Sequence, residues 1–161
     1  MSRILYNAAM SSSSITTAIR TGREDQLTEA LKRGDDVNQV DENGDMALIV
    51  AVRYNNLTLL QRLIAHGANV NQKDGVGNTA LLIAVRSHKT DFVKILLDKG
   101  ASMNDRDSFG LAAPDYARRA KNQDMAELME AAQKKRDYNP ATEKQQRVKA
   151  IAKTYKFKLQ F

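Results

Sequence analysis

Histidines are the side chains of this sequence that first invite a catalytic or metal-binding interpretation. His66 and His88 have neither a cysteine nor another histidine at the spacing of a metal site. His66 directly precedes a glycine, where a partly charged imidazole would stabilise the C-terminal end of a helix. The chain contains no cysteine, which excludes disulfides, thiolate ligands and a cysteine nucleophile. We therefore expect no metal site and no catalytic centre at the histidines.

Three aspartates recur at a fixed spacing and look at first like the paired acids of a hydrolase. Asp41, Asp74 and Asp107 are 33 residues apart, and a glycine follows each of them three residues later. Because aspartate and glycine are typical turn residues, we assign the aspartates to a repeated turn. The sequence also lacks a glycine-rich phosphate-binding motif. These observations predict a protein that is not an enzyme and has no cofactor.

Arginines at one position of the same repeat offer a chemistry of recognition instead. A planar guanidinium binds a carboxylate or a phosphate through two hydrogen bonds. If successive repeats stack at roughly 8–10 Å, the usual distance between packed helices, the guanidiniums form a ladder. An extended chain rises about 3.3 Å per residue, so an acidic residue at every third position would match this ladder. The four arginines are Arg20, Arg53, Arg86 and Arg119.

A structural role for these arginines is an equally open alternative. Each one follows the apolar run of an expected short helix, where the helix dipole favours a cation. In three of the four repeats an acid follows five residues later, at Asp25, Asp91 and Asp124, and could pair with the arginine locally. Repeats also arise by duplication, so four arginines at one position are not four independent observations.

The elements that must position these residues follow the same 33-residue period. The apolar runs 47–52 and 80–85 each predict a short buried helix, followed by a polar turn. Segments 57–66 and 91–99 then place apolar residues on one face of a second helix. A glycine such as Gly67 follows, where a helix ends in left-handed backbone. Each repeat is therefore predicted to be a helix, a turn, a second helix and a projecting β-turn finger.

In strict register, the segments DGVGNTALLIAV, FVKILLDKGASMN, LLQRLIAHGANVN and LKRGDDVN resemble the ankyrin-repeat pattern. The resemblance implies an all-α ankyrin-repeat solenoid over residues 1–137. It further implies a non-catalytic module that binds a partner protein through a concave groove and its fingers, as adaptor, inhibitor or effector. No repeat keeps the family's histidine, and we expect apolar packing to replace its polar network. The repeats span about residues 8–40, 41–73, 74–106 and 107–137, the first and last being atypical.

The predicted binding residues combine the arginines with apolar residues of the fingers. Val40, Val76 and Phe109 are apolar where the fingers should be exposed, although fingers that pack on each other would bury some of them. Aromatic residues and arginine are enriched at interface hot spots. The predicted partner is a protein with an extended, partly acidic segment. The predicted contact residues are Arg20, Arg53, Tyr54, Lys73, Val76, Arg86, Arg106, Phe109 and Arg119.

Positive charge is concentrated near the end of the sequence. Residues 134–161 carry nine basic and two acidic side chains, whereas residues 1–133 carry 16 and 17. We assign residues 138–161 to a basic extension that contains an amphipathic helix. Three uses remain open: a cap on the last repeat, a contact with an anionic membrane or an acidic partner, and nucleic-acid binding with aromatic stacking. The residues for such binding are Lys149, Lys153, Tyr155, Lys156, Phe157 and Lys158.

Length and composition agree with a single domain. The chain has 161 residues, of which 42% are hydrophobic and 27% charged, as in ordinary globular proteins. We expect no signal peptide and no membrane span, and therefore a cytoplasmic protein, in a host cell if it is a delivered effector. We also expect a monomer. The rival function, polyanion binding through the tail, would weaken steeply with salt, whereas an apolar protein interface would not.

Overall fold

The computed structural model describes residues 14–138, and its regular elements are α-helices, apart from an isolated β-bridge between Val40 and Met46. The chain divides into two compact units, residues 1–129 and 130–161, and the second is described only for residues 130–138. The described helices form consecutive pairs. These are α2 (Ser14–Arg20) with α3 (Glu24–Arg33), α4 (Ala47–Arg53) with α5 (Leu57–Ala65), α6 (Ala80–Arg86) with α7 (Thr90–Asp98), and α8 (Ala113–Arg119) with α9 (Gln123–Asp137).

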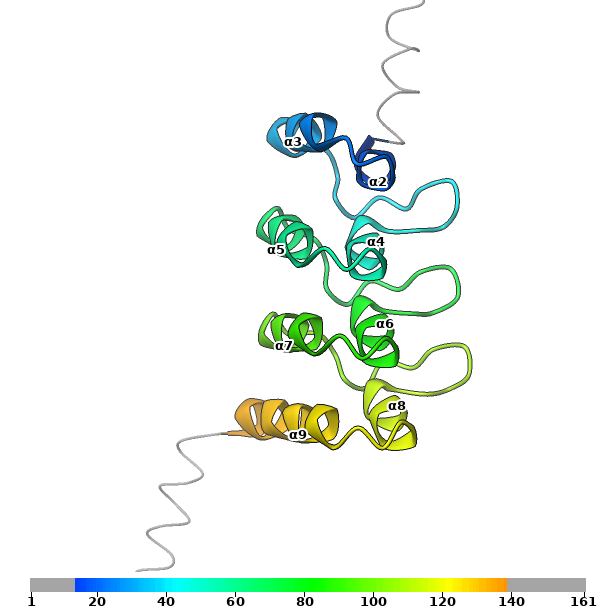
Figure 1. Ribbon diagram of the computed structural model, residues 1–161, viewed down its shortest axis with the longest axis vertical. Helices are drawn as coiled ribbons and strands as arrows, with labels where there is room; N and C mark the ends of the chain where they lie inside the picture. Colours follow the sequence, from blue (N-terminus) through cyan, green and yellow to red (C-terminus); the bar gives the residue numbers. More distant parts are fainter. Residues whose placement is uncertain (1–13, 139–161) are drawn as a thin grey trace, which may run out of the picture. The chain divides into compact units, whose positions relative to one another are not determined.

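Within the first unit, the first helices of the pairs stack on one another (Figure 1). Helix α2 contacts α4, α4 contacts α6 and α6 contacts α8, while α5 contacts α7 in a second row. The loops that join one pair to the next project on the side of the first helices (Figure 1). The predicted all-α fold of repeated helix pairs is thereby confirmed.

The first helices are short and almost entirely apolar because they are covered by neighbours in the stack. All residues of α4 from Ala47 to Val52 are buried, and only Arg53 at its end is exposed. The second helices bury a single stripe, which in α5 consists of Leu59, Leu60 and Leu63. Burying such a side chain stabilises the fold by about 1.5–3 kcal/mol. A single pair would leave α4 uncovered, so stability depends on stacking.

The turn inside each helix pair needs a residue with left-handed backbone. Gly22 holds this position in the first pair, and Asn55, His88 and Lys121 hold it in the others, with φ between 52° and 65°. Asparagine and histidine tolerate this conformation better than most residues. The ring of His88 also lies beside the next repeat, with its Nδ1 3.3 Å from Asn122 Nδ2. His88 thus has a structural position in the turn.

The expected replacement of the family's histidine by apolar packing is confirmed in two repeats. Ile49 and Leu82 occupy that position, and both are buried. The expected loss of polar contacts is wrong at α6 and α8, because a side chain still caps each of these two first helices. Thr79 accepts a hydrogen bond from the Leu82 N–H at the start of α6, and Asp115 accepts one from the Ala112 N–H at the start of α8. Caps of this kind stabilise a helix by about 1 kcal/mol.

Asparagine side chains connect the loops of successive repeats. Asn38 Nδ2 donates to the Gly67 carbonyl at 3.2 Å, and Asn38 Oδ1 accepts from the Asn69 N–H at 2.7 Å. Asn71 forms the same two bonds to the following repeat, at 3.3 and 2.7 Å. Each amide therefore satisfies two backbone groups of the next repeat, which fixes the spacing of the fingers that follow.

Candidate functional site

Five-residue fingers between the helix pairs carry the candidate site. In each finger the N–H of the first residue, an aspartate, donates to the carbonyl of the fifth. The glycine at the fourth position has positive φ, and at Gly77 an added Cβ would also lie 3.5 Å from the Ser108 nitrogen. This requirement explains the repeated glycine. The fingers are residues 41–45, 74–78 and 107–111.

The carboxylate of each finger aspartate folds back over its own turn. Asp74 Oδ1 accepts the Val76 and Asn78 N–H groups at 3.1 and 2.8 Å, and the other two fingers contain the same pair of bonds. These bonds use one carboxylate oxygen and leave the other, Oδ2, to face a second donor. The aspartates therefore hold the turns, as the sequence predicts, and they are not arranged as catalytic acids.

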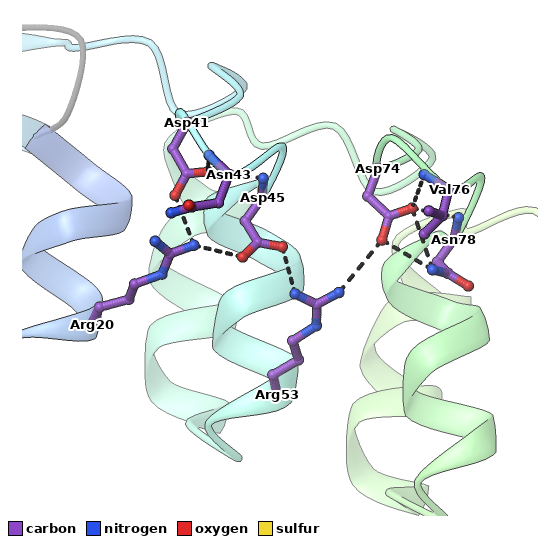
Figure 2. Close-up of polar contacts among 8 residues, drawn as sticks. All are labelled: Arg20, Asp41, Asn43, Asp45, Arg53, Asp74, Val76 and Asn78. Carbon is purple, nitrogen blue, oxygen red and sulfur yellow. Dashed lines mark hydrogen bonds and ion pairs between the residues drawn. The ribbon is translucent and has the colours of Figure 1, made fainter.

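Arg20 and Arg53 lie between finger carboxylates (Figure 2). Arg20 Nη2 donates to Asp45 Oδ2 at 2.5 Å and lies 2.8 Å from Asp41 Oδ2, within ion-pair range but not aligned for a hydrogen bond. Arg53 Nη1 donates to Asp45 Oδ1 at 2.5 Å, and its Nη2 lies 3.5 Å from Asp74 Oδ2. Two guanidiniums thus face three carboxylates, and these arginines connect neighbouring repeats.

Arg86 and Arg119 have different surroundings. At the spacing that brings Arg53 to Asp74, Arg86 would meet Asp107, but the Tyr116 hydroxyl donates to Asp107 Oδ2 instead. The Arg86 guanidinium lies over the Tyr116 ring, 5.3 Å from its centroid, and donates to the uncharged Asn78 Oδ1 at 3.2 Å. Arg119 is exposed. Within residues 14–138, neither arginine has a carboxylate at ion-pair distance.

The hydrogen bond between Tyr116 and Asp107 changes the pKa of both groups. The Tyr116 hydroxyl lowers the pKa of Asp107 below its ordinary value; burial opposes this, and the Leu111 and Phe109 N–H groups and Arg86 add to it. The same hydrogen bond raises the pKa of Tyr116, and burial adds to that rise. The charges of Arg86 and of Arg119, the last residue of α8, both oppose the rise, which places two cations near this hydroxyl.

Two equivalent positions of the repeat carry different residues along the chain, and these differences explain why the four arginines have different partners. The fifth residue of the finger changes from Asp45 to Asn78 and then to Leu111, so the carboxylate that holds Arg20 and Arg53 disappears along the chain. On the first helix, Tyr116 occupies a position that is aliphatic in the two preceding repeats. Aligning all residues of the repeat, and not only the arginines, would have revealed both changes.

The local pairing considered for the arginines is not what the structure shows. Their carboxylate partners are finger aspartates of their own and the next repeat, and not Asp25, Asp91 or Asp124. Asp91 lies 3.7 Å from Lys94 on its own helix. In the described part of the chain, the predicted ladder of four available guanidiniums therefore reduces to two.

The tips of the fingers are exposed and become more apolar along the chain. The middle residue is Asn43 in the first finger, Val76 in the second and Phe109 in the third. Val76 is 61% exposed and Phe109 75% exposed, so the fingers do not bury them against each other. Val40, just before the first finger, is also exposed.

Three other predicted contact residues have separate positions. Lys73 Nζ lies 3.2 Å from Asp105 Oδ1, and Arg106 Nη1 donates to the Gly110 carbonyl at 2.6 Å, so both basic groups brace the fingers. Tyr54 is exposed but lines a hollow of about 240 Å³ whose other residues come from α2, α3, α5 and the adjoining turns. It does not lie with the fingertip residues.

The predicted tail site and the expected C-terminal amphipathic helix fall outside the described residues. The tail site consists of Lys149, Lys153, Tyr155, Lys156, Phe157 and Lys158. Within residues 14–138, no group of three or more histidines or acids could hold a metal ion, and no helix is long and apolar enough to cross a membrane. His66 is the C-cap residue that follows α5.

Stacked helix pairs with projecting fingers define a class of repeat proteins whose side chains are displayed on rigid turns. A family model described as "Ankyrin repeats (3 copies)" matches residues 15–107. The chain therefore belongs to the ankyrin-repeat family. Ankyrin repeats are generally protein–protein interaction modules and typically have no catalytic activity.

A solved structure supports the same assignment. The chain is similar to the ankyrin repeat domain of Bcl-3, described as a unique member of the IkappaB protein family, with 28% sequence identity and a TM-score of 0.66. The similarity covers 72% of this chain and 50% of that chain, so this chain spans about half the length of its structural neighbour. No curated protein sequence matches the chain.

Proposed function

We propose that this protein is a non-catalytic module that binds a partner protein through its finger face. The finger face is the surface formed by the fingers 41–45, 74–78 and 107–111 and by the last residues of α2, α4, α6 and α8. The sequence predicts this surface as the concave groove and its fingers. Residues 1–137 supply the repeat stack and residues 138–161 a basic extension.

The observation that carries this proposal is the exposure of Val76 and Phe109 on rigid fingers. Each tip is fixed by hydrogen bonds from its backbone to the finger aspartate. A backbone held in this way loses little conformational entropy on binding, which favours affinity. Exposed aromatic residues beside arginine are typical of interface hot spots. A monomer of this kind, in the cytoplasm, would act as adaptor, inhibitor or effector.

Selection from a library of displayed protein fragments against the full chain tests the proposal. The affinity of a selected fragment is then measured for the chain, for the double variant Val76→Ser and Phe109→Ser, and for Tyr54→Ser. Tyr54 is the matched control, because it is exposed but lies outside the fingers. We expect the fingertip variant to lose at least tenfold in affinity and Tyr54→Ser less than twofold.

Other results would contradict an interface at the finger face. Loss of binding with Tyr54→Ser alone would move the interface to the hollow between α2, α3 and α5. Selection of fragments that bind through residues 138–161, or enrichment of polyanions with a steep salt dependence, would favour the rival function of the tail.

A further inference from the structure

We propose that the third finger, Arg86 and Arg119 form a recognition site for an acidic peptide segment that carries an apolar residue next to its acids. This proposal rests on the proposed function and assigns its site and the chemistry of its partner. Three observations carry it: the charge balance of the finger face, the position of Tyr116, and the apolar tip of the third finger.

The charge balance divides the finger face into two halves. In the first half, Arg20 and Arg53 are paired with carboxylates of the fingers. A peptide carboxylate arriving there would compete with a partner that is already in place. In the second half, Arg86 and Arg119 have no carboxylate within ion-pair distance in the described range. Their forks are therefore available to an incoming acid.

The acids near this half are already committed to other donors. Both oxygens of Asp107 accept hydrogen bonds, one from the Phe109 and Leu111 N–H groups and one from Tyr116. Asp115 lies 3.0 Å from Arg118 Nη2, in an ion pair on its own helix, and caps that helix. Asp105 lies 3.2 Å from Lys73. None of these carboxylates neutralises Arg86 or Arg119 by direct contact.

Tyr116 occupies the Asp107 oxygen that Arg86 would otherwise face. It donates to Asp107 Oδ2, whereas at the second finger Asp74 Oδ2 accepts from Asn78 Nδ2 at 3.0 Å and lies 3.5 Å from Arg53 Nη2. The Arg86 guanidinium lies over the Tyr116 ring, 5.3 Å from the centroid. A cation–π contact of this kind leaves the N–H groups of the guanidinium able to donate, and one of them donates to the uncharged Asn78 Oδ1. Tyr116 is thus a positioning residue for the arginine and is not itself the anion-binding group.

The apolar tip supplies the second half of the recognition. Phe109 belongs to the finger whose Asp107 is bonded to Tyr116, and it is 75% exposed. The corresponding tip of the first finger is the polar Asn43. Available arginines and an exposed aromatic ring therefore coincide at one end of the finger face. A segment with acids for the guanidiniums and an aliphatic or aromatic side chain for Phe109 complements both features.

The probe for this site is a 12-residue peptide with glutamate at every third position and one central phenylalanine, compared with the same peptide carrying glutamine for glutamate. Its binding to the full chain is followed by fluorescence anisotropy. The side-chain Nε–Hε signals of the arginines are followed by NMR. We expect the glutamate peptide to bind at least tenfold more tightly than the glutamine peptide and to shift the signals of Arg86 and Arg119 but not those of Arg20 and Arg53.

Matched variants make the test specific. Arg86→Gln with Arg119→Gln should lower the affinity at least tenfold. Lys94→Gln with Lys99→Gln removes the same charge from exposed positions in α7 and at its C-cap, and should change it less than twofold. Circular dichroism confirms that each variant is folded. Equal losses in both double variants, equal shifts at all four arginines, or no preference for the glutamate peptide would each overturn the proposal.

Two further outcomes separate this proposal from neighbouring ones. A 12-nucleotide poly-uridine strand that binds the same arginines more tightly than the peptide would overturn the assignment of a protein partner. A selected protein fragment that needs Phe109 but is indifferent to Arg86→Gln with Arg119→Gln would also overturn the acidic site, while the proposed function would stand. Peptide binding at the arginines without any selected partner at the fingertips would leave the acidic site standing and remove the support for the wider function.

Discussion

The second and third fingers have the same backbone but different partners for their first aspartate. Asp74 faces the guanidinium of Arg53, whereas Asp107 accepts the hydroxyl of Tyr116 and leaves Arg86 to one side. In both fingers the other carboxylate oxygen makes the same bonds to the turn. The repeated backbone is therefore maintained by local hydrogen bonds. The contact with the preceding arginine differs: Arg53 meets a carboxylate of the next repeat, and Arg86 meets the aromatic ring of Tyr116.

Under the proposed acidic site, this difference explains how a repeat stack acquires a binding site at low cost in stability. A partly exposed ion pair contributes only about 0–1 kcal/mol, and a hydrogen bond from an uncharged hydroxyl to a carboxylate contributes at least as much. Exchanging one for the other at Asp107 therefore does not lower stability. It changes the surface considerably, because the displaced arginine becomes available to a ligand.

The largest expected effect is on stability, at the second finger. Asp74→Ala should lower the free energy of unfolding by roughly 2–4 kcal/mol, because buried N–H groups of the turn lose a charged acceptor and Arg53 loses a partner. Urea denaturation measures the change. Asp107→Ala should cost less than Asp74→Ala, since no cation is left without its carboxylate.

Asp91→Ala is the control for this comparison. Its side chain is exposed, so the change should stay within about 0.5 kcal/mol. If Asp74→Ala were as mild as Asp91→Ala, the fingers would not depend on their aspartates.

The second effect concerns peptide binding, and the substitution that tests it makes the third finger resemble the first. Leu111→Asp places a carboxylate where Asp45 stands, at the position from which the first finger holds Arg20 and Arg53. We expect the new acid to pair with Arg119 and to weaken the binding of the glutamate peptide about tenfold, or about 1.4 kcal/mol. Leu111→Asn, which has the same shape without charge, should weaken it less than twofold. Equal effects of the two substitutions would show that charge is not the cause.

The third effect depends on pH and on the bond between Tyr116 and Asp107. Tyr116→Phe should lower the melting temperature by about 2–4 °C near neutral pH, as expected for the loss of one hydrogen bond. The pKa of Asp107 is lowered in the folded protein, so this contribution is present above its ordinary value of 3.8 and is lost as the pH falls through the lowered value. The pKa of Tyr116 is raised, so the contribution is present below 10.0 and is lost as the pH rises further.

The melting temperatures of the chain and of Tyr116→Phe are measured by thermal denaturation between pH 2.5 and pH 10.5. They should therefore differ in the middle of this range and converge towards both ends. A difference that stays constant over the whole range would mean that the hydroxyl stabilises the fold by some other contact.

The smallest effect compares two arginines directly. Arg53→Gln should lower the free energy of unfolding by about 0.5–1 kcal/mol, because its pair with Asp45 and Asp74 is partly exposed. Arg119→Gln should change it by less than about 0.5 kcal/mol. Urea denaturation at low and at high salt checks this. The loss of unfolding free energy in Arg53→Gln should shrink as salt is added. A loss that does not depend on salt, at either residue, would contradict the division into paired and available arginines.

Some features of the site were predictable from the register and others were not. The exposure of Val76 and Phe109 follows from their place in a repeated turn. The position of Tyr54 in a hollow beside α2 does not, because it depends on how the first repeat packs against the second. The left-handed turns at His88 and Lys121 also lacked a signal, since glycine marks that position only in the first repeat.

By itself, the sequence determined the period, the helix pairs and the fingers. These follow from local rules, because apolar spacing, glycine and aspartate act on the chain within a few residues of themselves. Only the tertiary structure decided which arginines are available. Arg53 and Arg86 occupy the same position in their repeats, and they differ because stacking brings Asp74 to one and Tyr116 to the other, from parts of the chain more than twenty residues away.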